Sequence, residues 1–238
     1  MSRIKLKNFD AKIFTMPAWE WIKPRAGYNK MSSRKILSGL CLGLALTAAA
    51  GDCLAGWSPF KLQVSQEGWV WPEDIDTVAG LNLNISGDTP EMYGLQMGFQ
   101  NGGNTAAGAQ LGLVYNYALD SFYGLQLSPA RNLTEMQYGI QFGGWNVSSE
   151  MFGAQVGWLR NQAGSGLGLM LAPVNVSTAR MRGIQIGVVN NSPGDMSGIQ
   201  LGAVNICRGT LKGLQIGFAN LAGRNGVLPV TIGLNAGF

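Results

Sequence analysis

The chain lacks histidine altogether, and charged residues make up only 13% of its 238 residues. Without an imidazole it has no Ser-His or Cys-His nucleophile pair and no histidine-ligated metal. Three cysteines, of which Cys41 lies in an apolar run near the N-terminus, are too few for a disulfide framework. We therefore expect no enzyme, with no catalytic residue, no cofactor-binding residue and no metal site.

Glycine, in contrast, is abundant, with 35 residues, and this composition favours a repetitive β protein. The net charge of +4 is concentrated near the N-terminus, because residues 51–238 hold eight Lys/Arg against eleven Asp/Glu. The remainder of the chain is mildly acidic, so we expect no nucleic-acid partner. No phosphate-binding Gly loop is present, and no small-molecule substrate is identifiable.

Residues 31–55 have the order of a secretory signal peptide. Arg34 and Lys35 precede an uncharged run from Ile36 to Ala50, and small residues follow it. A transmembrane anchor is the alternative, but fifteen residues are fewer than the roughly 18 of a membrane span. We therefore expect a cleaved signal at 31–55 behind an N-terminal extension at 1–30, with Met31 as a second candidate start, and export to the bacterial outer membrane or cell surface.

A tandem repeat fills residues 79–238, after a lead-in at 56–78 with a possible first strand. Its motif is Gly-apolar-Gln-apolar-Gly, and both neighbours of every centre are apolar. Strict alternation of this kind predicts β-strands with one apolar face and one face of Gly and Gln. The eleven centres, 14 to 16 residues apart, and a twelfth candidate at Gln63 are Gln63, Asn82, Gln96, Gln110, Gln126, Gln141, Gln155, Met170, Gln185, Gln200, Gln215 and Thr231.

Two all-β architectures use such strands, and they place the faces oppositely. In an antiparallel up-and-down transmembrane barrel the apolar face meets lipid and the centres face a lumen; in a β-solenoid the apolar face is the core and Gly and Gln face water. Asn recurs five or six residues after most centres, as at Asn190 and Asn205. Since Asn favours turns, we expect it to mark the end of each strand.

Four features favour the barrel, with about twelve strands. The motif is palindromic and so presents the same faces in either strand direction, and fifteen residues divide into a spanning strand of roughly 9 or 10 and a turn. Twelve centres are an even number. The last strand alternates apolar residues from Val230 to Phe238, the final residue, and resembles the C-terminal assembly signal of outer-membrane barrels.

The tandem Gly-Leu/Ile-Gln-Ile/Leu-Gly units over residues 79–238 also resemble the surface-repeat family of bacterial outer-membrane proteins. This resemblance implies a location at the outer membrane or cell surface, with the lipid bilayer and the barrel-assembly machinery as partners. We therefore expect a porin-like, non-enzymatic surface barrel that is structural or passes small solutes passively. The alternative is a soluble secreted β-solenoid for surface binding or adhesion.

Overall fold

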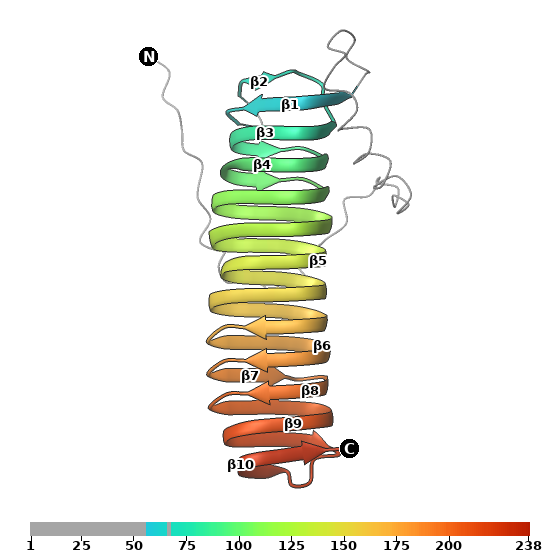
Figure 1. Cartoon of the computed structure of the whole chain (residues 1–238), viewed down its shortest axis with the longest axis vertical. Coiled ribbons are helices and arrows are strands. Elements are labelled where there is room, and N and C mark those ends of the chain that lie inside the picture. The colour runs from blue at the N-terminus through green and yellow to red at the C-terminus, as the bar shows by residue number, and fades with distance from the viewer. Residues whose placement is uncertain (1–55, 66–67) are drawn as a thin grey trace.

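The computed structural model describes residues 56–65 and 68–238, and over this part the chain forms a parallel β-solenoid of about nine turns. Figure 1 shows the turns stacked into one straight column, with β1 near one end and β10 at the other. The expected N-terminal extension and signal peptide lie outside the described residues. Across the described part, no helix is long and apolar enough to cross a membrane.

Ten strands make up the sheet. β5 runs on through several turns of the coil without a break, whereas β7 and β8 together account for a single turn (Figure 1). The strands are β1 (Trp57–Gln63), β2 (Val70–Trp71), β3 (Thr77–Asp88), β4 (Glu91–Gly102), β5 (Thr105–Leu171), β6 (Val174–Ile186), β7 (Val189–Ser192), β8 (Asp195–Leu201), β9 (Val204–Arg224) and β10 (Val230–Gly237).

Successive repeats pair in parallel and in register, so that each repeat forms one turn of the coil. Gln185 of β6 lies opposite Gln200 of β8, which lies opposite Gln215 of β9. The same register places glycine beside glycine and one Asn beside the next, as with Asn190 and Asn205. Identical residues therefore stack over most of the column, with departures such as Met170 opposite Gln185.

Both ends of the column are closed by a short antiparallel pairing. At the N-terminal end β1 pairs in parallel with β3 and antiparallel with β2. At the C-terminal end the chain reverses after β9, and β10 pairs antiparallel with it. An exposed sheet edge is a template for further pairing, so these two hairpins end the stack.

The prediction of a closed antiparallel transmembrane barrel was wrong, and so was the prediction of a porin-like fold. The palindromic motif that favours alternating strand directions is equally compatible with parallel stacking, because like residues then meet at every position. The repeat length is also divided differently: fifteen residues hold two short strands and two corners, as in β7 and β8, rather than one spanning strand and a turn. The chain instead forms a β-solenoid, which was the alternative prediction.

The solenoid was expected to have an apolar core and to present Gly and Gln to water, but the structure places these faces the other way round. Gln185 and Gln200 are completely buried inside the coil, whereas the apolar neighbours Ile184, Ile199 and Leu201 are exposed. The Asn residues expected in turns are also inside, in the middle of strands such as β7. Amides fill much of the interior, and apolar side chains stand on the surface.

Candidate functional surface

The glutamines of the repeat centres form a hydrogen-bonded ladder inside the coil. The side-chain amide of Gln200 donates to Oε1 of Gln185 at 2.7 Å, and Gln215 donates to Gln200 at 2.8 Å. The same arrangement runs from Gln155 up to Gln96. Most of these buried amides are thereby satisfied by a neighbouring amide, and this satisfaction stabilises a polar interior.

A second ladder of asparagines runs beside the first and points the opposite way. Asn190 donates to Oδ1 of Asn205 at 2.8 Å and to the carbonyl of Leu201 at 2.9 Å. Its members donate toward the C-terminus, whereas the glutamines donate toward the N-terminus. The ten members are Asn84, Asn101, Asn116, Asn132, Asn146, Asn161, Asn175, Asn190, Asn205 and Asn220.

Apolar and small side chains fill the rest of the interior. A cluster of Met151, Met170, Met181 and Met196 extends along the C-terminal half, with Leu211 at its end. Phe122 and Met92 belong to a second cluster in the N-terminal half. The free thiol of Cys207 is buried in the first cluster, and burial is the main cause that raises its pKa.

The glycine two residues before each centre is required by the backbone. Gly183 has φ +135°, a conformation that side chains rarely adopt, and a Cβ there would collide with the carbonyl oxygen of Gly168 in the preceding turn. The same φ region and the same collision recur from Gly80 to Gly213. Glycine at this position thus permits the close stacking of turns.

The expected lumen-facing centres from Asn82 to Gln215 lie inside the coil, and Gln63 is buried too, although it lies opposite Asn84 rather than opposite a centre. In β1 it is Lys61, not Gln63, that lies opposite Asn82. In β10 it is Asn235, not Thr231, that lies opposite Gln215, because this strand runs backward. The eight Gln centres from Gln96 to Gln215, together with Asn82 and Met170, are buried to 99% or more.

Lys61 is a buried cation that the repeat pattern did not reveal. Its ammonium donates to the carbonyl of Asp88 and to the hydroxyl of Thr89, both at 3.2 Å. Desolvation lowers the pKa of Lys61, and the nearby carboxylates of Asp88 and Asp76 oppose this shift. The ammonium occupies the position of a centre and closes the N-terminal end of the amide interior.

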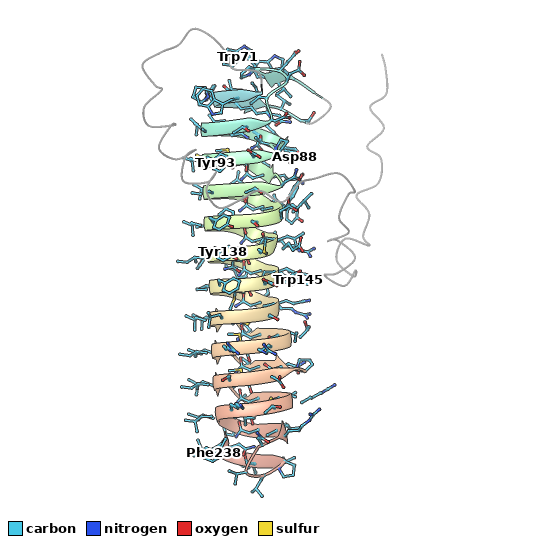
Figure 2. The ribbon with its side chains drawn as sticks, turned by 90° about the vertical axis from the view of Figure 1, so that its right-hand side faces the viewer. Trp71, Asp88, Tyr93, Tyr138, Trp145 and Phe238 are labelled. Carbon is cyan, nitrogen blue, oxygen red and sulfur yellow. The ribbon has the colours of Figure 1, made fainter. Side chains whose placement is uncertain are left out.

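The most extensive surface feature is a continuous apolar face. We define it as the side chains directly before and after each centre, from Leu81 to Ile216, continued by Leu234 and Ala236 of β10. None of them is buried; Ile140 and Phe142, for example, are 47% and 41% exposed. All are apolar, and no charged side chain interrupts the two rows. Figure 2 shows side chains projecting from turn after turn along one side of the column.

Aromatic rings border the apolar face. Tyr123, Tyr138 and Phe152 lie three residues before successive centres, and their rings stack with centroids 4.7 and 4.9 Å apart. Tyr93 in the same row is buried, and burial, followed by the charge of Glu91, raises its pKa to about 12. Over these turns the row adds apolar width to the face, whereas Arg182 and Lys212 occupy the same row in the C-terminal half.

A different stack lies on the opposite side of the coil, where Figure 2 shows Trp145. The guanidinium carbons of Arg131 and Arg160 lie 4.7 and 5.6 Å from the Trp145 ring centroid. Burial lowers the pKa of both arginines. Each guanidinium is attracted to the face of the ring, which favours packing of these side chains from successive turns.

No family model, no curated protein and no solved structure matches this chain. Within the described residues, no group of three or more His, Cys, Asp or Glu could hold a metal ion. The candidate functional surface is the apolar face, because its side chains are exposed along the described column. The apolar residues that flank every centre indicated this face in the sequence. Their hydrophobicity, however, led to the prediction that the face contacts lipid or forms the core.

Proposed function

We propose that this chain is a non-enzymatic, secreted β-solenoid that acts by surface binding, with the apolar face as its binding surface. The observation that carries the proposal is the exposure of two uninterrupted apolar rows along the whole column. Monomeric proteins rarely expose contiguous apolar patches larger than a few hundred Å², and larger ones mark interaction sites. The expected signal peptide at 31–55 and export to the cell surface belong to this proposal.

The amide interior supports a scaffold of this kind. Because the Gln and Asn ladders hold the turns together from inside, the stack does not depend on burying the flanking residues. Those residues are thereby left available for a partner. A long, straight, repetitive face suits binding to an extended surface better than binding to a compact ligand.

Binding of a neutral apolar dye, Nile red, tests the proposal. We expect the dilute full chain to enhance the dye's fluorescence, and Ile140→Lys/Phe142→Lys to reduce this enhancement. Thr178→Lys is the matched control, since Thr178 is exposed and lies outside the two rows. Equal fluorescence of all three proteins, with unchanged circular dichroism, would mean that the face does not bind apolar partners.

A further inference from the structure

We propose that the partner of the apolar face is a second copy of this chain, packed face to face and antiparallel. This inference rests on the proposed binding function of that face. Three observations support it: the size of the face, its lack of charge, and the distribution of charge along the column beside it.

The size of the face matches a stable dimer interface. Its strands follow one another at ~4.8 Å, so about ten of them span ~45 Å; the two rows together with the bordering row three residues before the centres are about five residues, or ~15 Å, wide. The resulting area, roughly 700 Å² per copy with this border included, is close to the ~800 Å² that each partner buries in a standard interface. Two flat sheet faces of this kind pack ~10 Å apart in β-sandwiches.

Charge is segregated along the column. Residues 56–155, with 66–67 set aside, hold eight Asp/Glu and two Lys/Arg, a net charge of −6; residues 156–238 hold one Asp and six Lys/Arg, a net charge of +5. Parallel packing would place like charges side by side. Antiparallel packing instead brings the acidic half of each copy against the basic half of the other, and such complementarity fixes orientation.

Charged residues lie directly beside the face in both halves. Glu91 and Glu150 occupy the position five residues before a centre, as do Arg180 and Asp195 in the C-terminal half. Arg182 projects from the same strand side as Arg180, since Met181 and Gln185 between and beyond them point inward. An antiparallel partner would bring this edge of its basic half, which carries Arg180 and Arg182, against the acidic half of the first copy, without pairing the charged residues one to one.

A uniform lipid surface has no acidic and basic halves to match those of the column. A second copy therefore accounts for the charge distribution, whereas a membrane does not. A symmetric dimer of this type uses the same surface on both copies and therefore closes without further growth.

Sedimentation equilibrium of the full chain tests the proposal. We expect a dimer at micromolar concentration, weakened about 30-fold or more by Phe142→Lys and unchanged by Thr178→Lys. Arg180→Glu/Arg182→Glu and Glu91→Lys/Glu150→Lys should each weaken self-association, whereas an equimolar mixture of the two variants should associate more strongly than either variant alone. A monomer at 100 μM that still binds Nile red would overturn the dimer and leave the binding function standing; loss of both would overturn both.

Spin labels measure the orientation. With Cys41, Cys53 and Cys207 replaced by Ser, a label at Leu95→Cys should lie roughly 35 Å from its counterpart in an antiparallel dimer, which corresponds to about seven strand spacings. A label at Ala154→Cys, near the middle, should be close to its counterpart. Close pairs at both positions would show a parallel dimer, and filaments that persist in Phe142→Lys would show end-to-end pairing; either result would overturn the proposal.

Discussion

Nε2 of Gln185 lies 3.5 Å from Sδ of Met170, at the point where the glutamine ladder loses a rung. Elsewhere in the ladder each glutamine after Gln96 donates to the oxygen of the glutamine one turn before it, as Gln200 donates to Gln185. On the other side of the gap, Oε1 of Gln155 is buried and has no hydrogen-bond partner within the described part of the chain. Met170 thus leaves an unpaired acceptor and replaces an amide acceptor by a weak sulfur one.

The change Met170→Gln should therefore stabilise the solenoid. The new amide would donate to Gln155 and accept from Gln185, in a side chain of similar length. We expect an increase of about 1–3 kcal/mol in the free energy of unfolding, measured by urea denaturation. Met181→Gln is the control and should lower stability, because Met181 lies opposite Gly166 and Met196 rather than in line with the glutamine ladder. A loss of stability in both variants would mean that the gap is required.

Gly183→Ala should destabilise the solenoid by about 2–5 kcal/mol, since it combines an unfavourable φ with a collision against the preceding turn. Gly233→Ala in β10 separates the two effects, because Gly233 also has a positive φ but nothing lies within 4 Å of an added Cβ. We expect the larger loss for Gly183→Ala in thermal denaturation. Equal losses would show that backbone conformation alone demands these glycines.

Asn190→Asp should cost more stability at neutral than at acidic pH. A carboxylate cannot donate to Asn205 and Leu201 as the amide does, and it would carry a charge into the interior. Protonation restores one donor and removes the charge, so the loss relative to the parent chain should shrink as the pH falls. A pH-independent difference between the two proteins in urea denaturation would contradict the buried position of the ladder.

Ionisation of Tyr93 should lower the free energy of unfolding of the solenoid at alkaline pH. Its pKa in the folded chain is about 12, against 10.0 for a free side chain, so the folded state keeps a proton that the unfolded state releases. This contribution to stability is complete below pH 10 and is lost as the pH rises to about 12. Tyr93→Phe should remove this part of the decline in unfolding free energy. Glu91→Gln should move the onset of tyrosine ionisation, followed by absorbance, to lower pH.

The sequence predicted the strands around the repeat centres well, because strict alternation around residues such as Gln185 has one structural meaning. It did not predict which face is inside. Hydrophobicity places Ile184 and Ile186 in a core or in lipid, and only identical amides stacked turn upon turn make the opposite arrangement stable. The recurrence of Gln and Asn themselves, where any polar residue would suit a solvated face, was the available signal.

The two ends could not be predicted from the repeat. Lys61 replaces the centre in β1, and Asn235 takes that position in β10 because the chain has reversed, so the period points to Gln63 and Thr231 instead. The prediction of a turn at Asn190 was wrong for a related reason. A preference for turns is a local property, whereas the Asn ladder is satisfied by residues one turn away in the stack.

Cysteine accessibility tests the central claim, that the amides are inside and the apolar residues outside. Ile199→Cys, Leu201→Cys and Met196→Cys, each with the native Cys207 as an internal reference, should be compared by thiol labelling of dilute native protein. We predict that cysteines at 199 and 201 react nearly as fast as in denatured protein, whereas 196 and Cys207 are protected. Protection at 199 and 201 in a monomeric sample would place the apolar rows in the interior and contradict this structure.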